Sequence, residues 1–202
     1  MIYHRRRLAR LIRQHIGSVF GLHIGIHPGF REPLEEFRAL ANILSVELFA
    51  PLAEPMEKTQ LKSFLVKCDI LSLTERELAS LTGLSTIKTN YVLLYDLGAH
   101  IVVIRRGANG STVLDFTQQM IVDIPAVQVD VALDLGAGNA YCGAFLAGWA
   151  KHEDTVLAGC YGASAASIII ESIQMPIVSA ELEKEALLRA EKLKNNCVVR
   201  KP

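Results

Sequence analysis

Two glycines one residue apart, Gly136 and Gly138, stand where a stretch rich in small, helix-forming residues begins. The preceding run, residues 121–132, favours an extended conformation that Pro125 interrupts, and a helix is predicted over residues 139–151. Glycine lets the backbone approach a ligand closely, and the first N–H groups of a helix attract negative charge. The spacing therefore predicts an anion-binding site. The alternative is a tight turn whose glycines only let the helix pack against a sheet.

Two common phosphate-binding loops are excluded by the residues that follow these glycines. A P-loop ends in Gly-Lys-Ser/Thr, whereas Gly138 is followed by Asn139 and Ala140. The dinucleotide fingerprint has a third glycine three positions after the second, and this chain has Tyr141 there. The identity of the site therefore depends on the rest of the chain.

Composition limits the class of protein. The chain has 202 residues, 50% of them hydrophobic, and a formal net charge of zero. A chain of this length can bury about 70% of its unfolded surface, so we expect a single domain over residues 1–202. The neutral balance argues against a nucleic-acid partner, and no apolar run approaches the roughly 20 residues that span a membrane.

The cysteines are scattered and form no CxxC pair. This pattern predicts neither a disulfide framework nor a metal site, and it favours a reduced, cytoplasmic compartment. The four residues are Cys68, Cys142, Cys160 and Cys197.

Hydrophobic periodicity predicts helices that alternate with buried strands, followed by a short antiparallel piece. This order implies an α/β fold, a three-layer α/β/α domain with a mostly parallel sheet. Ligands of such sheets bind beyond the carboxyl ends of the strands, so the glycine loop, Thr74 and Gly107 could share one edge. The expected strands are 20–26, 43–49, 68–73, 100–104, 112–115 and 119–124, and the expected helices are 3–16, 32–41, 59–67, 74–83, 86–97, 139–151, 154–171 and 179–193.

Local motifs support particular boundaries of these elements. Thr74 and Glu77 form a capping box at the start of one helix, and Gly83 ends it. Arg105 to Gly110 is a hairpin-like connection with an Asn-Gly turn. His23 and His27 lie four residues apart, but on a strand this spacing predicts no metal site.

Four segments match a known family in the same order. Residues 69–83 are similar to the segment around an Asn-x-x-Glu motif, and residues 101–111 to a strand followed by Gly-x-x-Gly. Residues 125–148 are similar to a region that ends in Asp-Thr-x-Gly-Ala-Gly-Asp, and residues 158–171 to an alanine-rich helix beside the adenine. Through these motifs the chain resembles the PfkB, or ribokinase-like, carbohydrate kinases over about residues 20–175.

The amino-terminal part resembles a divergent branch of this family found in fungi and other eukaryotes, on the basis of His23, His27-Pro28 and Arg31. A complete member is longer, and its first portion carries substrate-binding residues and a lid. The resemblance therefore implies a truncated or reduced member that lacks much of this portion. An exposed sheet edge would then favour self-association, for example as a homo-dimer.

The resemblance implies ATP-dependent phosphoryl transfer to a hydroxyl group of a sugar, nucleoside or similar small alcohol, with ATP and Mg²⁺ as cofactors. Gly136, Ala137 and Gly138 would hold the negative charge that develops on the transferred group. Glu77 would belong to the magnesium network, or would serve only the capping box. The residues implied in nucleotide binding are Gly107, Gly110, Gly138, Gly162, Ala163 and Ser167. As alternatives, Gly107 and Gly110 form a plain turn, and the last three residues only allow tight helix packing.

Three departures from the family pattern argue against full activity. The family's catalytic base is the acid directly after the second glycine, where this chain has Asn139, and an amide cannot take up a proton near neutral pH. Asn139 can instead cap the helix. Thr74 replaces the asparagine of Asn-x-x-Glu. Leu133 replaces an aspartate, which puts the monovalent-cation site in doubt, and Asp134 would point the other way on a strand.

Three hypotheses follow from the sequence. The first is an active carbohydrate kinase. The second is a catalytically impaired pseudokinase that acts as a nucleotide-binding or protein-interaction module, for which Asn139 and Leu133 argue. The third is a protein that binds a partner through the basic segment at residues 4–13.

Overall fold

The computed structural model of the protein describes residues 10–11, 13–14, 18–27 and 34–202. Contacts within the chain divide it into two compact units. Unit 1 comprises the residues up to 103 together with 116–118 and Pro202, and unit 2 comprises residues 104–115 and 119–201. The expectation of a single domain over the whole chain stays a prediction.

The described residues form seven strands, which follow one another in chain order within one sheet. The strands are β1 (Val19–Ile26), β2 (Ala41–Leu48), β3 (Ile70–Thr74), β4 (Ile101–Arg105), β5 (Ser111–Asp115), β6 (Met120–Ile124) and β7 (Val198–Arg200). The α-helices are α2 (Leu34–Arg38), α3 (Lys58–Leu65), α4 (Glu75–Thr82), α5 (Ile87–Asp96), α6 (Ala137–His152), α7 (Thr155–Glu171) and α8 (Ala180–Lys194). A single 3₁₀ turn, η1, covers Gly107–Asn109.

Parallel pairing characterises the strands of unit 1. β1 pairs with β2, and β2 pairs with β3, both in parallel. All residues of β2 except Asn42 are buried, as is usual for a strand inside a parallel sheet. Leu44 and Val46 of β2 are fully inaccessible, and Leu61 and Leu65 of α3 are 1% exposed. These side chains belong to the hydrophobic core of the unit.

The predicted capping box is present at the start of α4. The Thr74 hydroxyl accepts a hydrogen bond from the Glu77 N–H at 3.3 Å, and the Glu77 carboxylate accepts one from the Thr74 N–H at 2.6 Å. Gly83 ends the helix in the left-handed conformation with φ 73°, which glycine adopts without steric cost. Both boundaries were predictable because local hydrogen bonds set them.

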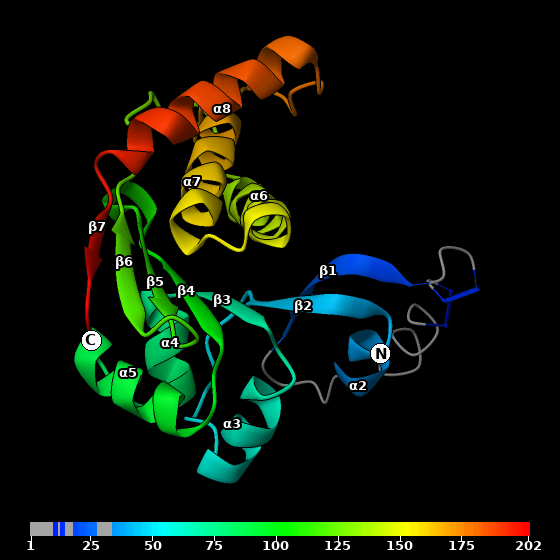
Figure 1. The fold of residues 1–202 in the computed structure, drawn as a ribbon, viewed down its shortest axis with the longest axis vertical. Coiled ribbons are helices and arrows are strands. Elements are labelled where there is room, and N and C mark those ends of the chain that lie inside the picture. The colour runs from blue at the N-terminus through cyan, green and yellow to red at the C-terminus, as the bar shows by residue number, and fades with distance from the viewer. Residues whose placement is uncertain (1–9, 12, 15–17, 28–33) are drawn as a thin grey trace. The chain divides into compact units, whose positions relative to one another are not determined.

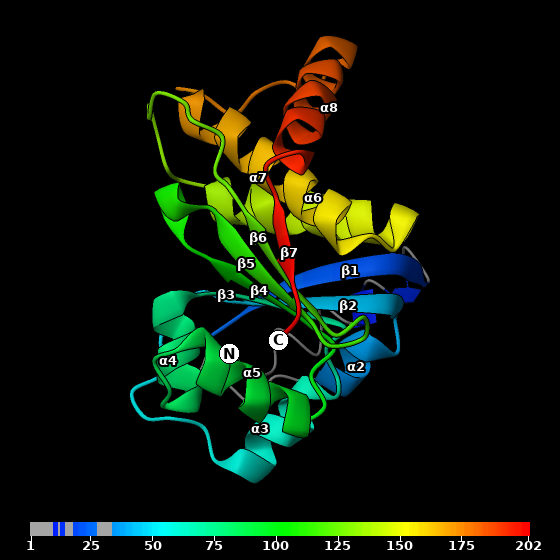
Figure 2. The same cartoon turned by 60° about the vertical axis from the view of Figure 1, so that its left-hand side comes forward.

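Antiparallel pairing and three long helices characterise unit 2. β6 pairs with β5 and β7, so these three strands are antiparallel neighbours (Figure 2). The helices α6, α7 and α8 pack against one another (Figure 1). α7 lies directly on β6, because a Cβ built on Gly159 would be 1.8 Å from Ile124 Cδ1.

Apart from the helix predicted over residues 3–16, the predicted elements are found within a few residues of their expected bounds, with two exceptions. β7 was not predicted, because three residues are too few to show a periodic pattern. The extended run predicted over residues 121–132 is wrong beyond Ile124, where β6 ends. Pro125 follows, and it has no N–H to donate to a neighbouring strand.

Two further expectations fall outside the described residues. Most of the helix predicted over residues 3–16 lies there, and so do Pro28 and Arg31. Among the described residues, no helix combines the length and hydropathy needed to cross a membrane.

Thr74→Ala should lower the free energy of unfolding by about 1 kcal/mol, because the Glu77 N–H loses its hydrogen-bond acceptor. Urea denaturation measures this loss. Ser85→Ala is the matched control, since Ser85 is an exposed hydroxyl residue directly before the next N-cap, Thr86. It should change stability by less than about 0.5 kcal/mol. Equal losses in the two variants would contradict the capping role of Thr74.

Candidate anion-binding site

The amino-terminal end of α6 offers free backbone N–H groups. Gly136 is the N-cap, in the left-handed conformation with φ 92°, and no side chain caps the helix. The Ala140 N–H donates to the Gly136 carbonyl at 3.0 Å. The N–H groups of Gly138 and Asn139, which precede Ala140 in the first turn, therefore have no acceptor within the helix. Together with the positive end of the helix dipole, they make a site that attracts an anion.

Asn139 does not cap this helix, so that alternative is wrong. The helix begins two residues earlier than predicted, which makes Gly136 the N-cap and Asn139 the third helical residue. The N-cap side chain is the one that accepts from the N–H groups of the first turn, and Gly136 has no side chain to do so. The Asn139 side chain is exposed in the first turn, beside the N–H groups described above.

The loop before the site is held against α7. The N–H groups of Ala132 and Leu133 both donate to the Ile170 carbonyl, at 2.9 and 3.1 Å. Residues 125–136 form no strand, so the argument from strand alternation against Asp134 does not apply to this loop. Asp134 is exposed, and the side chains of Leu133 and Leu135 are 42% and 76% exposed. The loop therefore presents apolar side chains beside the free end of the helix.

The two glycines of the β4–β5 connection differ in surroundings. Gly107 is exposed with φ 56°, and a Cβ added to it would meet nothing within 4 Å. Gly110 has φ 79°, and a Cβ there would lie 2.1 Å from the Ile124 carbonyl oxygen and 2.9 Å from the Ala126 nitrogen. Gly110 is thus required by the close approach of two backbone segments, whereas Gly107 leaves open space beside the turn.

Tyr141 connects α6 to the strand that follows this turn. Its hydroxyl lies 2.8 Å from Ser111 Oγ, and both residues are buried. Burial raises the pKa of Tyr141, while the hydrogen bond with Ser111 acts in the opposite direction. The hydroxyl group therefore stays protonated at neutral pH and can take part in this hydrogen bond. The contact fixes the first turns of α6 relative to β5.

The three residues predicted beside an adenine lie within the packing of helices. A Cβ on Gly162 would be 2.9 Å from the Tyr141 ring, so Gly162 allows α7 to approach α6. Ala163 is buried. The Ser167 hydroxyl donates to the Ser164 carbonyl at 2.7 Å and accepts from Arg189 of α8 at 3.0 Å. Close helix packing explains these residues, and their nucleotide role stays a prediction.

Glu77 lies in unit 1, and its capping role is confirmed by the hydrogen bonds at Thr74. The side chain is largely buried, and carboxylate oxygens are the ligands that Mg²⁺ prefers. Its metal role stays a prediction, as does the expectation that Thr74, Gly107 and the glycine loop share one sheet edge.

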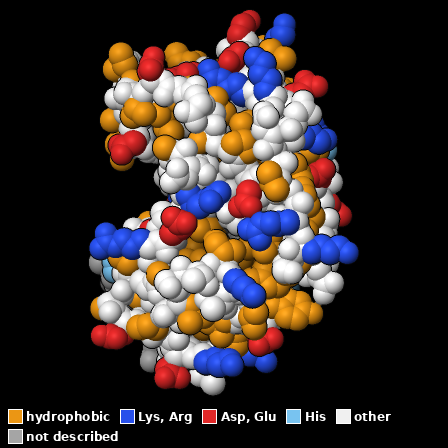
Figure 3. Space-filling view, turned by 90° about the vertical axis from the view of Figure 1, so that its left-hand side faces the viewer, with side chains coloured by type: hydrophobic (Ala, Val, Ile, Leu, Met, Phe, Trp, Pro, Cys, Tyr) orange, Lys and Arg blue, Asp and Glu red, His pale blue; other side chains and the backbone are white. Residues whose placement is uncertain are grey.

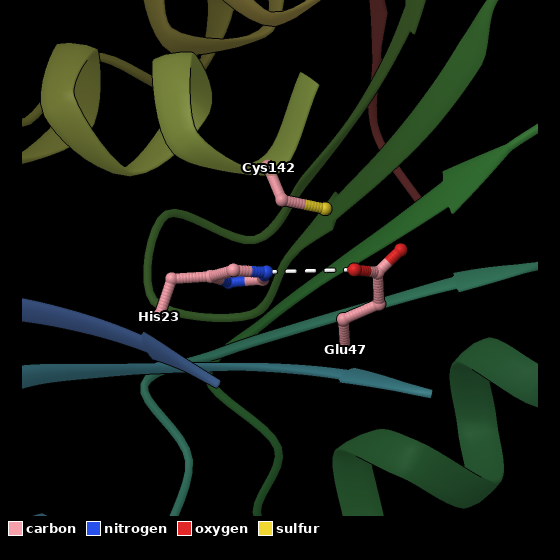
Figure 4. Close-up of side chains that lie close together, drawn as sticks. All are labelled: His23, Glu47 and Cys142. Atoms are coloured by element: carbon pink, nitrogen blue, oxygen red, sulfur yellow. Dashed lines mark ion pairs between the residues drawn. The ribbon is translucent and has the colours of Figure 1, made fainter. Parts of the chain in front are cut away.

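The sequence did not predict that three polar residues of unit 1, His23, Ser45 and Glu47, would lie next to one another. His23 Nδ1 lies 3.0 Å from Ser45 Oγ, and His23 Nε2 lies 3.5 Å from Glu47 Oε2 (Figure 4). Ser45 and Glu47 are buried, and a buried carboxylate requires such a partner. Two polar residues on one side of an apolar strand were the sequence signal for these contacts. Cys142, also drawn in Figure 4, belongs to unit 2.

Arg106, directly before Gly107, was also missed. Its guanidinium donates to the Ser111 carbonyl at 3.4 Å and lies 3.6 Å from Asp123 Oδ1. Asp123 further accepts a hydrogen bond from Arg200 at 3.1 Å, which ties β7 to β6. The available signal was a pair of arginines at the end of a strand and before a glycine turn.

Gly110→Ala should destabilise the protein far more than Gly107→Ala. The left-handed conformation costs an alanine about 1–2 kcal/mol at either position. At Gly110 the contact with Ile124 adds an overpacking cost, for a total of roughly 2–5 kcal/mol. Urea denaturation of both variants measures the difference. Similar losses at the two positions would refute the close approach at Gly110.

Comparison with known proteins adds to this geometry. Residues 33–179 match the model of the pfkB family carbohydrate kinases. A cytidine kinase of Thermococcus kodakarensis is 31% identical over 91 residues, which cover 45% of this chain and 33% of the relative. The matched part of this chain therefore spans about a third of the length of that curated relative.

Solved structures show the same fold. Arabidopsis thaliana ribokinase, complexed with ribose and ATP, is 18% identical with a TM-score of 0.65, and the match covers 84% of this chain and 55% of that one. Vibrio cholerae fructokinase, in its fructose, ADP and calcium ion bound form, is 16% identical with a TM-score of 0.63, covering 83% and 61%. These likenesses confirm the predicted ribokinase-like α/β fold class, in a chain that spans about 60% of such structures. Since the family model matches most of its length, the chain belongs to the pfkB family of carbohydrate kinases.

Proposed function

We propose that this chain binds the phosphates of ATP or ADP, with Mg²⁺, at the amino-terminal end of α6. The observation that carries this proposal is the uncapped helix end, where Gly136 with φ 92° leaves the N–H groups of Gly138 and Asn139 available. Because the chain belongs to a kinase family, we take the bound anion to be the phosphate groups of a nucleotide. The ribokinase and fructokinase structures that share the fold contain ATP and ADP, respectively.

The surrounding residues take supporting roles in this proposal. Gly107 leaves space beside an exposed turn for a nucleotide to approach, and Gly110 sets the position of that turn. Gly162, Ala163 and Ser167 give α7 its close packing on α6 and α8, and would limit the adenine side of the site. Glu77 is the residue that the family resemblance implies for magnesium, and its carboxylate oxygens suit that ion. Magnesium would neutralise phosphate charge.

The proposed reaction is phosphoryl transfer to a hydroxyl group of a sugar, nucleoside or similar small alcohol. The N–H groups of Gly136 and Gly138 would stabilise the charge on the transferred group, whereas the Ala137 N–H donates to the Asp134 carbonyl at 3.4 Å. Asn139 occupies the position of the family's base and can donate or accept a hydrogen bond, but cannot hold the proton. Positioned acid–base catalysis is typically worth about 10²–10⁴-fold, so a slow reaction is expected.

A second candidate function is a pseudokinase that binds nucleotide or a protein partner without catalysis. Asn139 favours it, and so does the loop beside the site, where Leu133 and Leu135 expose apolar side chains. An interaction surface commonly combines exposed apolar side chains with a polar rim.

The proposal extends to the partners of the protein and to its location in the cell. Basic and acidic side chains are interspersed over the face shown in Figure 3, which together with the zero net charge argues against a nucleic-acid partner. We place the protein in the cytoplasm, away from membranes. β7 is an exposed strand, with Val198 and Val199 more than half exposed, and could support a homo-dimer.

Gly138→Leu should weaken binding of ADP with magnesium by about tenfold or more, because a side chain at the helix end blocks close approach of a phosphate. Isothermal titration calorimetry on the folded protein measures this. Gly143→Leu is the matched control, because Gly143 lies in the same helix, is exposed, and would place a Cβ in open space. Its affinity should equal that of the original chain.

Absence of saturable binding at millimolar ADP, in a sample shown to be folded, would refute the nucleotide proposal. Equal weakening by the two leucine variants would place the nucleotide elsewhere.

Asn139→Asp should raise the rate of phosphoryl transfer by about 10²–10⁴-fold, because a carboxylate can take the proton of the acceptor hydroxyl. A coupled assay of ADP release, run over a panel of sugars and nucleosides, measures the rate. Asn139→Gln keeps an amide and should leave the rate unchanged. If the aspartate variant binds nucleotide but transfers no phosphoryl group, the pseudokinase function is favoured instead.

A further inference from the structure

Two cysteines far apart in the sequence meet in unit 2. Cys160 lies in the middle of α7, and Cys197 lies between α8 and β7. Their sulfur atoms are 3.5 Å apart, and both cysteines are free thiols. Cys160 is fully inaccessible, whereas Cys197 is partly exposed. The pair thus combines one protected thiol with one that a small solute can reach.

We propose that Cys160 and Cys197 form a reversible disulfide when the protein meets a peroxide. A disulfide has its sulfur atoms about 2.05 Å apart, so closure requires an approach of roughly 1.5 Å. Cys160 is fixed by its helix. Cys197 follows a turn at Asn195 and Asn196 and precedes β7, outside regular structure, so it can supply this movement by small backbone rotations.

The hydrogen bond between the two thiols divides their roles. Either sulfur can donate in this contact, and the Cys197 S–H can also donate to the Leu193 carbonyl at 3.4 Å. The contact lowers the pKa of Cys197 and raises that of Cys160. Burial raises the pKa of Cys160 further and opposes the lowering at Cys197. Asp154 also raises the pKa of Cys160, and Lys194 lowers it. Cys197 is therefore the better nucleophile, and Cys160 is suited to react second.

The reaction balances with hydrogen peroxide as the oxidant. The Cys197 thiolate attacks one peroxide oxygen, the O–O bond breaks, and the products are a sulfenic acid and, after protonation, water. Cys160 sulfur then attacks the Cys197 sulfur, the S–O bond breaks, and the departing hydroxide takes the Cys160 proton as water. In total two thiols lose two electrons and two protons, and one peroxide becomes two waters. An external thiol reverses the step by disulfide exchange.

The other two thiols are not expected to compete. Cys68 is buried, and burial raises its pKa to about 12, so it is hardly ionised at neutral pH. Its S–H donates to the Phe64 carbonyl in the last turn of α3 at 3.4 Å. Cys142 is also buried. Peroxide should therefore react first at the partly exposed Cys197.

The disulfide would join α7 to the segment that connects α8 with β7. α7 carries Gly162, Ala163 and Ser167, so the bond would fix the helix that limits the proposed nucleotide site. Preorganisation reduces the entropy lost on binding. Oxidation should therefore tighten ADP binding a few-fold, an effect that rests on the proposed function. The disulfide itself does not depend on it.

The first test counts thiols after treatment with one equivalent of hydrogen peroxide. The reduced chain has four thiols, and denaturing titration should find two after oxidation, with residues 160 and 197 linked in the peptide map. Cys197→Ser should keep its three thiols under the same treatment, and Cys160→Ala should form no internal disulfide. Cys68→Ser is the matched control and should lose two of its three. Four remaining thiols in the original chain, or a different linkage, would overturn the proposal.

The second test separates the disulfide from the function. The oxidised protein should melt roughly 5–10 °C higher than the reduced protein, because the bond constrains the unfolded chain. ADP titration of both forms then measures the effect on affinity. If the link forms and neither form binds ADP, the proposed function fails while the disulfide stands. If both forms bind ADP equally, the disulfide has no effect on this site, and the regulatory inference is refuted.

Discussion

The packing of Tyr141 is the constraint on which the rest of unit 2 depends. Its ring fills the space that Gly162 leaves on α7, and its hydroxyl bonds Ser111 at the start of β5. One buried side chain therefore holds a helix, a second helix and a strand together. Replacing Tyr141 by a smaller residue would remove buried apolar surface, and it would leave the buried Ser111 hydroxyl without its partner.

This constraint determines how the candidate site is presented. Because Tyr141 lies in the second turn of α6, anchoring it fixes the helix end one turn earlier. Gly136 is the left-handed N-cap at that end, and no side chain caps the first N–H groups of the helix. Tyr141 stands where a dinucleotide-binding loop would have its third glycine. A bulky anchor at that position is compatible with an anion site of the pfkB type.

The proposed site combines the backbone of a helix end with Asn139, which stands where the family has an acid. The helix end and its glycines depend on backbone conformation, which a change at Asn139 leaves intact. Proton transfer depends on the chemistry of one side chain, so it can be lost while anion binding remains. Leu133 and Leu135, in the loop before α6, add an exposed apolar surface beside this helix end. Under the proposed function, anion binding and catalysis would therefore be separable by single substitutions.

The sequence by itself determined the local structure: the order of the elements up to α8, the capping box at Thr74, the end of α4 at Gly83 and the glycine pair before α6. Hydrogen bonds and periodicity within a few residues specify such features. Only the tertiary structure decided that Gly136 rather than Asn139 caps α6, that Tyr141 meets Ser111, and that Cys160 lies 3.5 Å from Cys197. β7 likewise exists only through pairing with β6. Apart from the start of α6, these contacts join residues tens of positions apart, and periodicity carries no information about which distant side chains meet.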